Sequence, residues 1–342
     1  MMKLIHGVKL AFFTVGTSIF FMSQPVSAKS KEHLVTDQQA LEELYYQRDY
    51  QSVKASLNQL SRPLNIDEQL LVVAMKVQHD EDDASDTLEA FTKAHINNAK
   101  VQYWAGNLWQ TIAKNSSMFS KMSIYSHYVK AMTRAATLEP ENARYQMEAA
   151  KAYGQPSMMG GDSDKQAPIV IKLLQGDSPF AHIAYMDLLQ NTKKEEEAVR
   201  YAVDIAKQFK NNPEIVERAA QLLWTFGDKN NAGELFYQTC MLPPPIKEAY
   251  LKWDAACWYS VLFSDNGSLA LDKGILAGQR VLKLSNVKDS NYIDTLELYA
   301  QLLVKAKQTN SAILAYEELI TLTTNKKVKR TAKLKLEKLE KG

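Results

Sequence analysis

Residues 180–212 read FAHIAYMDLLQNTKKEEEAVRYAVDIAKQFKNN, and residues 213–245 read PEIVERAAQLLWTFGDKNNAGELFYQTCMLPPP. Each segment has a run of small and apolar residues at helical spacing, then a short polar turn, then a second run at the same spacing. Ala198 and Ala232 occupy the same place in the two second runs. Two helices cross closely where a small side chain lies between them. The pattern therefore predicts pairs of antiparallel helices that repeat along the chain.

The same signature recurs towards both ends of the chain. Because a single helical pair leaves an apolar face uncovered, a stack needs several neighbours and a polar terminal cap. We therefore expect an all-α fold, an α-α superhelix of about eight helical hairpins with a C-terminal capping helix. Regular copies lie at residues 41–63, 71–94 and 296–319; stretched copies begin at Trp104, Tyr145 and Ala255, with an insert expected at 116–125 and a loop at 155–164.

One short run could be a strand instead of a helix. Residues 168–171 read Pro-Ile-Val-Ile, which is rich in β-branched side chains. Proline is acceptable in the first turn of a helix, and the run fills the place of a second helix in its unit. We therefore favour a helix, and we expect residues 29–342 to form one solenoid with possible sub-blocks 29–98, 99–178 and 179–342.

Residues 1–28 have the layout of a secretory signal peptide. Lys3 precedes a mostly apolar stretch from Leu10 to Met22, and the small residues Val26 and Ala28 stand where signal peptidase recognises its substrates. The apolar core has about a dozen residues, fewer than the roughly 20 that a spanning helix needs. We expect cleavage after Ala28 and no stable insertion of the mature chain into a membrane.

The charge of the expected mature chain is balanced. The leader contains Lys3 and Lys9 and no acid, so 39 of the 41 basic side chains remain against 39 acidic ones. Binding to a phosphate backbone depends on a basic field, so we expect no nucleic-acid partner.

The C-terminal segment 326–342 is an exception, because it contains eight Lys or Arg and two Glu. Its apolar residues recur at helical spacing, which favours a capping helix with solvated lysines. A weak contact with anionic lipid is the alternative. The apolar positions are Val328, Ala332, Leu336 and Leu339.

The two cysteines, Cys240 and Cys257, could form a disulfide in an exported protein. On neighbouring antiparallel helices, however, their heights would differ by about 10 Å at a rise of 1.5 Å per residue. Bridged Cα atoms lie within about 7 Å of each other. We therefore expect both thiols to stay unpaired.

Sequence motifs for catalysis or metal binding are scarce. No His-Glu-x-x-His pair is present, and the two cysteines alone cannot form a structural zinc site. The acidic run 80–83 lacks the glycine and glutamate of an EF-hand loop. Gly176-Asp177-Ser178 echoes a serine-hydrolase motif, but that motif requires a strand-to-helix turn over a sheet. We expect no metal site, no cofactor and no enzymatic activity.

The loop at 160–165, Gly-Gly-Asp-Ser-Asp-Lys, precedes an expected helix whose free N–H groups could hold an anion. It does not match the phosphate-binding loop of nucleotide enzymes. The structural alternative is that the glycines let the chain turn and that Asp162 or Ser163 caps the helix. If the loop is functional, Gly160, Gly161 and Asp162 would belong to a partner contact.

The repeating unit resembles the tetratricopeptide-repeat (TPR) family, whose period of about 34 residues equals the spacing of Ala198 and Ala232. This likeness covers nearly all of the mature chain. Over roughly residues 100–175 the chain is similar to a group of exported, uncharacterised TPR proteins of Gram-negative bacteria. That narrower likeness rests on the helix Tyr103-Trp104-Ala105-Gly106 and on the loop from Pro156 to Gly161. The first helices of the units mostly have alanine where the family has glycine, and the stretched units break the period.

The resemblance implies a periplasmic scaffold that binds a protein or peptide in the groove lined by the first helices of the pairs. Each residue expected in that groove could instead be an ordinary solvated side chain, and the tryptophan a partly buried core residue. The expected groove residues are Asp187, Asn191, Gln221, Trp224, Gln301 and Lys305.

A small-molecule or lipid-binding accessory protein of an envelope transport system is the alternative function. In that case aromatic side chains would line a pore. The aromatic residues in question are Tyr45, Tyr46, Trp104, Trp109, Trp224, Trp253 and Trp258.

Overall fold

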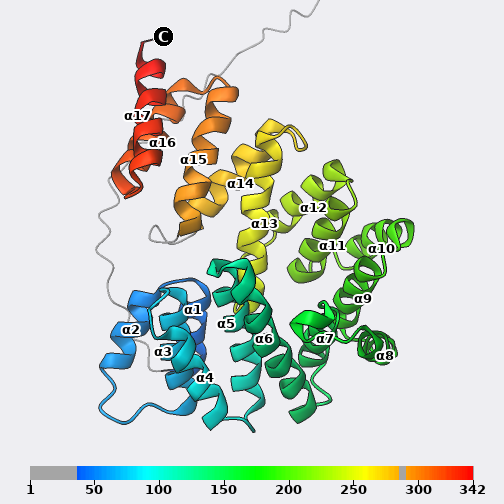
Figure 1. The fold of residues 1–342 in the computed structure, drawn as a ribbon. Coiled ribbons are helices and arrows are strands. Elements are labelled where there is room, and N and C mark those ends of the chain that lie inside the picture. Colours follow the sequence, from blue (N-terminus) through cyan, green and yellow to red (C-terminus); the bar gives the residue numbers. More distant parts are fainter. Residues whose placement is uncertain (1–36, 285–289, 342) are drawn as a thin grey trace, which may run out of the picture. The chain divides into compact units, whose positions relative to one another are not determined.

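The computed structural model describes residues 37–284 and 290–341, which belong to one compact unit. The predicted signal peptide lies outside the described residues. Within them the chain forms seventeen α-helices and one 3₁₀ turn and no strand (Figure 1). The all-α prediction is confirmed, and residues 168–171 lie inside a helix.

The helices follow one another as eight pairs and a final helix. The first helices of the pairs, called A helices here, are α1 (Gln38–Tyr46), α3 (Ile66–Gln78), α5 (Ala99–Asn115), α7 (Ala143–Tyr153), α9 (Pro179–Asn191), α11 (Pro213–Thr225), α13 (Glu248–Asp265) and α15 (Ser290–Lys305). The second helices, called B helices, are α2 (Tyr50–Asn58), α4 (Ala84–Ala94), α6 (Met118–Leu138), α8 (Ser163–Leu174), α10 (Glu195–Gln208), α12 (Lys229–Met241), α14 (Leu271–Leu284) and α16 (Thr309–Leu322). The final helix is α17 (Lys326–Glu340), and the 3₁₀ turn η1 is Ser157–Met159.

Each A helix packs against the B helix that follows it. Most A helices also pack against the A helix of the next pair, as in the series α7, α9, α11, α13 and α15. Contacts of this kind between successive A helices define an α-α superhelix, as the repeat pattern predicts. In addition, α1 packs against α13, which lies far along the chain.

Six of the A helices end in the same way. The second residue after the helix adopts a positive φ, between 54° and 89°, which is the left-handed conformation that closes many helix C-termini. The chain then turns at once into the B helix, so that the two helices of a pair lie antiparallel. The residues concerned are Arg48, Asp80, Lys193, Gly227, Gly267 and Lys307.

Small residues mark the places where the helices of a pair meet. Ala198 on α10 and Ala232 on α12 have no solvent exposure, and Phe236, one helical turn after Ala232, is equally buried. All three belong to one core cluster with the inner residues of α9 and α11. A larger side chain at either alanine would push the two helices apart. Both alanines therefore have the role that their equivalent places in the repeat predict, which is to let the helices pack closely.

The prediction of an insert at residues 116–125, between the helices of the third pair, is wrong. Helix α5 runs to Asn115, α6 begins at Met118, and Ser117 caps α6 by accepting a hydrogen bond from the backbone N–H of Ser120 at 3.3 Å. The hairpin is longer than its neighbours, so its tip buries little, and Phe119 is 90% exposed. The apolar period disappears there because periodicity reports burial, whereas the helix continues without it.

The expectation of two free thiols is also wrong, because Cys240 and Cys257 form a disulfide with their Cα atoms 4.6 Å apart. The expectation assumed a tight turn between the two helices. Instead, residues 242–247 contain three consecutive prolines and start in an extended conformation at Leu242. An extended segment of this kind advances about 3 Å per residue. Helix α13 therefore starts beyond the end of α12, and Cys257 is level with Cys240 on the way back.

The last helix caps the stack, as predicted. Helix α17 packs against α16, with Ala332 buried and Val328, Leu336 and Leu339 half-buried in the third core cluster. The proposed sub-blocks of the solenoid stay predictions. Among the helices that the structure describes, none is long and apolar enough to cross a membrane.

Candidate functional site

Charged side chains from five A helices and from the turn after α1 converge in one region, called here the A-helix charge cluster. It consists of six cations and six carboxylates, and it includes ion pairs that join helices far apart in sequence. The members are Arg48, Lys114, Arg144, Glu148, Lys151, Asp187, Glu214, Glu217, Arg218, Glu248, Lys252 and Asp254.

Two arginines in this cluster make close, directional pairs. Arg144 on α7 donates two hydrogen bonds of 2.9 Å to the carboxylate of Glu214 on α11, and its guanidinium lies 4.3 Å from the ring centre of Phe180. Arg218 on α11 donates to Asp187 and to Gln190 on α9, each at 2.6 Å. Charge-assisted pairs of this geometry are strong, so they hold α7, α9 and α11 in register.

The lysines of the cluster are held loosely. Lys252 Nζ lies 3.8 Å from Glu217 Oε2, and Lys151 Nζ lies 3.7 Å from Glu148 Oε2. These separations are charge contacts that exceed hydrogen-bond length, and both carboxylate oxygens are buried without a hydrogen-bond partner among the described residues. Gln221 donates to the other oxygen of Glu217. Burial raises the pKa of the Glu217 carboxyl above its ordinary value.

Lys114, in the last turn of α5, makes no hydrogen bond or ion pair with the residues that the structure describes. Part of its side chain is exposed, yet the surrounding helices desolvate the ammonium group and lower its pKa. The charges of Lys252, Arg48 and Lys151 lower that pKa further. These four cations, called here the cation cluster, come from four separate segments. Arg48, Lys151 and Lys252 each lie within 4 Å of a carboxylate, whereas Lys114 lies within that distance of none that the structure describes.

An exposed apolar tip lies next to the cation cluster. The tip is formed by Met118, Phe119 and Met122 at the start of α6, and their side chains are 74%, 90% and 40% exposed. Only the turn at residues 116–117 separates α6 from the helix that carries Lys114. Neighbouring apolar side chains with this exposure usually mark a place where another molecule binds.

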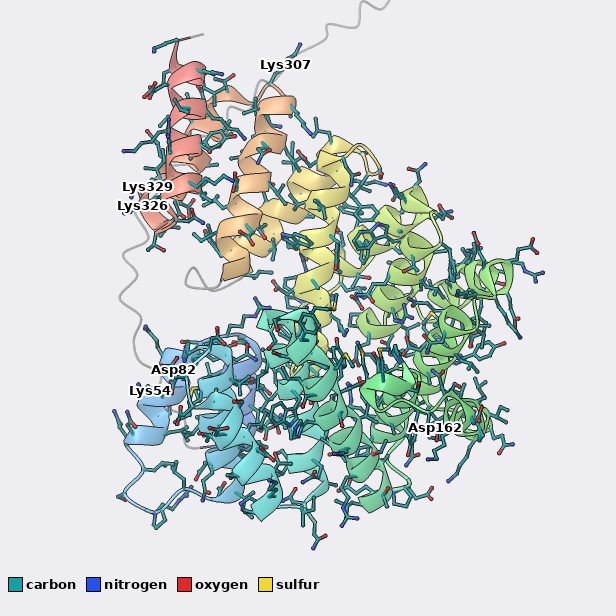
Figure 2. The ribbon with its side chains drawn as sticks, in the orientation of Figure 1. Lys54, Asp82, Asp162, Lys307, Lys326 and Lys329 are labelled. Atoms are coloured by element: carbon teal, nitrogen blue, oxygen red, sulfur yellow. A yellow bond between two sulfur atoms is a disulfide. The ribbon has the colours of Figure 1, made fainter. Side chains whose placement is uncertain are left out.

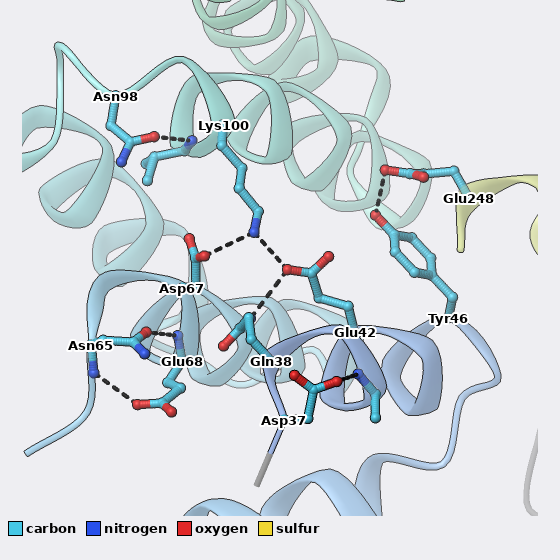
Figure 3. A network of polar contacts seen from close by, with 12 residues as sticks. Asp37, Gln38, Glu42, Tyr46, Asn65, Asp67, Glu68, Asn98, Lys100 and Glu248 are labelled. Atoms are coloured by element: carbon cyan, nitrogen blue, oxygen red, sulfur yellow. Dashed lines mark hydrogen bonds and ion pairs between the residues drawn. The ribbon is translucent and has the colours of Figure 1, made fainter. Parts of the chain in front are cut away.

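A second polar network joins α1 to α3, α5 and α13, and Arg48, in the turn after α1, lies 3.7 Å from Asp254 on α13. Lys100 Nζ donates to Glu42 at 2.6 Å and to Asp67 at 3.0 Å, which ties α5 to α1 and α3 (Figure 3). The Tyr46 hydroxyl donates to Glu248 Oε1 at 3.0 Å, which ties the end of α1 to the start of α13. Arg48 lies in the turn directly after Tyr46, so these contacts fix its position relative to α13.

The six residues predicted to line a groove do not all lie together. Asp187 and Gln221 belong to, or directly contact, the A-helix charge cluster. Asn191 donates to Gln166 of α8 at 3.2 Å instead. Trp224 is 38% exposed, and its ring packs edge-on against Tyr259 and Phe263.

The remaining two residues lie on α15. Gln301 is half-buried, and Lys305 donates to the Asp265 carboxylate at 2.7 Å at the end of α13. The partner-binding role of all six residues stays a prediction.

The cations Lys114, Lys151, Lys252 and Arg48 were not predicted from the sequence. A lysine in the last turn of α5 and of α7 is a weak signal for the first two, because cations are common at helix C-termini for electrostatic reasons. No sequence spacing relates Arg48 to Lys252, which come together only because α1 packs against α13.

The backbone geometry of the loop at residues 160–162 requires its two glycines. Gly160 has a φ of 89°, and a Cβ on Gly161 would lie 1.7 Å from the carbonyl oxygen of Gln155. Asp162 precedes α8, but its carboxylate pairs with Lys165 at 2.8 Å and makes no capping hydrogen bond. The Asp162 side chain therefore does not cap α8. The two glycines do let the chain turn, as expected.

Replacing Gly161 by alanine is expected to destabilise the protein by roughly 1–3 kcal/mol, because the backbone of the loop must move to admit the methyl group. Thermal unfolding followed by circular dichroism measures the change. The control is Gly176→Ala, since a Cβ at Gly176 meets only the Leu173 carbonyl oxygen at 3.6 Å. Equal stability of the two variants would contradict the steric role of Gly161.

Most of the aromatic residues that could line a pore are core residues. Trp104 and Trp109 are each 5% exposed, Trp253 is completely buried, and Tyr45 and Tyr46 are each 6% exposed. The rings of Tyr45 and Tyr46 pack against Trp104 at 5.2 and 5.5 Å between centroids. These side chains stabilise the fold and do not line a pore.

In the part of the chain that the structure describes, no three His, Cys, Asp or Glu side chains come together in a way that could hold a metal ion. The carboxylates of the A-helix charge cluster are instead interleaved with lysines and arginines.

No protein-family model and no curated protein matches the chain. Among solved structures, the chain is similar to one in the crystal structure of the APC/C hetero-tetramer Cut9-Hcn1, with 14% identity and a TM-score of 0.38 over 88% of this chain and 54% of that one. It is also similar to a chain in the structure of Naa15/Naa10 bound to HypK-THB, with 13% identity and a TM-score of 0.26 over 89% and 55%. The chain therefore spans about half the length of these two proteins.

Proposed function

We propose that this protein is a scaffold that binds a protein partner along its A helices, and that the cation cluster recognises an acidic segment of that partner. The observation that carries the proposal is Lys114, an ammonium group without an anionic partner among the described residues and surrounded by three further cations. We also propose that the scaffold acts in the periplasm, after removal of the leader.

The charged form of Lys114 is disfavoured in the free protein. Desolvation and like charges disfavour the charged form of Lys114, which is why its pKa is lowered. A carboxylate placed among the four cations would supply the missing counter-charge. Lys151 and Lys252 can shift towards such a group, because they meet their own carboxylates only at 3.7 and 3.8 Å. Binding of an acidic group therefore removes a repulsion that the free protein contains.

The neighbouring apolar tip supports a protein partner over a small molecule. Protein interfaces are enriched in Met, Arg and aromatic residues, and they combine an apolar centre with charged groups that set the orientation. Met118 and Phe119 supply the apolar part, a few residues along the chain from Lys114. A partner segment with acidic and large apolar side chains fits this surface.

Two observations support export. Residues 1–28 have the layout of a secretory leader. The Cys240–Cys257 disulfide is a feature of proteins in oxidising compartments such as the bacterial periplasm. Fractionation of cells that express the full chain tests this proposal, because a periplasmic protein is released by osmotic shock in a form that lacks the leader. Recovery of the uncleaved chain in the cytoplasm would contradict it.

Charge reversal at the cation cluster tests the binding site. Partners are captured from envelope extract on the wild-type protein, and the affinity of an acidic peptide from the captured protein is then measured by calorimetry. Lys114→Glu combined with Lys252→Glu is expected to weaken binding by about 100-fold, because two attractive charges become repulsive. Binding should also weaken as salt increases.

The control is Lys54→Glu, which changes an exposed lysine on α2 outside the cluster and should alter the affinity less than about twofold. Unchanged affinity in the double variant would disprove the acidic-segment proposal. Retention of a small molecule by the purified protein in native mass spectrometry would favour the carrier function instead.

A further inference from the structure

The charges of the chain are unevenly distributed along it. Residues 326–342 contain eight Lys or Arg and two Glu. Residues 29–342 contain 39 basic and 39 acidic side chains, of which 31 basic and 37 acidic ones lie in residues 29–325. The body of the protein is therefore net acidic, and its net basic charge is concentrated on α17.

Helix α17 presents five of these cations on its solvent side. Its opposite side packs on α16 through Ala332 and its half-buried apolar neighbours. On the solvent side, Leu334 is 51% exposed among the basic residues. Figure 2 labels Lys326 and Lys329 at the start of the helix. The α17 basic face is defined here as the exposed residues Lys326, Lys327, Arg330, Lys333, Leu334 and Lys338; the exposed Glu337 lies among them, and Glu340 is exposed at the end of the helix.

Helix α17 carries its basic residues close together along the chain. Elsewhere some exposed lysines pair with a carboxylate, as Lys93 does with Glu89 at 2.6 Å, and others, such as Lys54, make no ion pair within the described residues. Within the described residues, no Lys or Arg side chain of α17 makes an ion pair or a hydrogen bond, although Lys333 and Glu337 lie one turn apart on the helix. Lys335 is placed over the ring of Tyr316 at 5.9 Å. The positive charge of the basic face is therefore not neutralised by the part of the protein that the structure describes.

We propose that the α17 basic face binds the surface of an anionic lipid bilayer. Five cations and the exposed Glu337 lie along the solvent side of this helix, which has 15 residues and is about 22 Å long, and its net positive charge is complementary to a plane of anionic headgroups. Leu334 lies where an apolar side chain of an interfacial helix enters the boundary between headgroups and acyl chains. The face contains a single exposed large apolar residue, which suits a uniformly charged plane better than a shaped protein surface. The acidic body would be repelled by the same membrane, so the contact is confined to α17.

The test is sedimentation of the mature chain with lipid vesicles. Vesicles of phosphatidylcholine with about 30% phosphatidylglycerol are expected to bind the protein at least about tenfold better than phosphatidylcholine alone. Raising the salt to about 0.5 M should abolish binding, because screening then acts over only a few ångströms. Equal binding to both kinds of vesicle, or binding that resists salt, would overturn the proposal.

The decisive variant reverses three charges on the basic face, Lys327→Glu, Arg330→Glu and Lys333→Glu. It is expected to lose at least about tenfold in binding to the anionic vesicles. The matched control reverses three exposed lysines on other helices or turns, at Lys54, Lys210 and Lys229, and should bind anionic vesicles within about threefold of the wild type. If both triple variants lose binding equally, overall charge and not the α17 face is responsible, and the proposal fails.

Circular dichroism and thermal unfolding show whether both triple variants are folded. Vesicle binding by the α17 basic face does not depend on the cation cluster. The variant Lys114→Glu with Lys252→Glu should therefore retain vesicle binding. If the wild type ignores anionic vesicles but binds soluble polyglutamate through the same face, the occupant is an acidic protein and the lipid proposal is wrong.

Discussion

Replacing Arg218 by methionine is expected to destabilise the protein by roughly 3–5 kcal/mol, because the substitution leaves a buried carboxylate without its counter-ion. Asp187 is 8% exposed and receives its charge-assisted hydrogen bond from Arg218 at 2.6 Å. Its second oxygen already lacks a hydrogen-bond partner among the described residues. Methionine fills much of the volume of the arginine chain, so the loss reports mainly the charge and the hydrogen bonds. Urea unfolding followed by circular dichroism measures it.

Two companion variants make this experiment specific. Arg200→Met removes an exposed arginine from α10 and should change stability by less than about 0.5 kcal/mol. Arg218→Met with Asp187→Leu removes both charges and should recover part of the loss, since no unpaired charge then remains. A single Arg218→Met variant as stable as Arg200→Met would show that the pair between α9 and α11 contributes nothing.

Reduction of the Cys240–Cys257 disulfide is expected to cost about 3 kcal/mol of stability, because the bond closes a loop of about 17 residues in the unfolded chain. Both cysteines are completely buried, so thiol reagents should not reach them after reduction until the protein unfolds. The free energy of unfolding is measured in urea with and without reductant. The loss should be largest for probes of α12 and α13, such as the fluorescence of Trp253, whose indole N–H donates to the Cys240 carbonyl oxygen at 3.0 Å.

A double variant, Cys240→Ala with Cys257→Ala, separates the bond from the reducing conditions. Its stability should match that of the reduced wild type within about 1 kcal/mol, with a small further loss from the two smaller side chains, and it should not respond to reductant. Two reactive thiols in the unfolded protein before reduction would show that the disulfide does not form.

The local features of the fold were predictable because they depend on neighbours in sequence. Ser178 followed by Pro179 is a residue pair typical of a helix start, and in the structure Ser178 caps α9. The small residues Ala198 and Ala232 marked helix crossings, and both are completely buried. Repetition of these signals at a regular spacing is enough to predict a stack of helical pairs, because each pair must cover the apolar face of the next.

Two local predictions failed for reasons of burial and of loop geometry. The hairpin tip around Phe119 is helical without being buried, so apolar periodicity could not detect it. The cysteines pair because the proline segment between α12 and α13 is long and extended, a geometry that a repeat with short turns does not anticipate.

The candidate site was predictable only where one repeat contacts the next. Asp187 and Gln221, two of the six residues expected in the groove, contact the charge cluster, whereas their role in binding a partner stays a prediction. Lys114 and Lys252 could not be connected, because they belong to repeats far apart in the chain and no repeat spacing relates them.

The amino-acid sequence by itself determined the helical pairs, their order and the capping helix α17, since caps, turns and apolar stripes act over a few residues. The tertiary structure alone decided which charges meet. The packing of α1 against α13 brings Arg48 and Lys252 to the same place as Lys114, and a small change in the rotation between successive pairs would separate them. Such rotations accumulate over many contacts between helices, which no single stretch of sequence specifies.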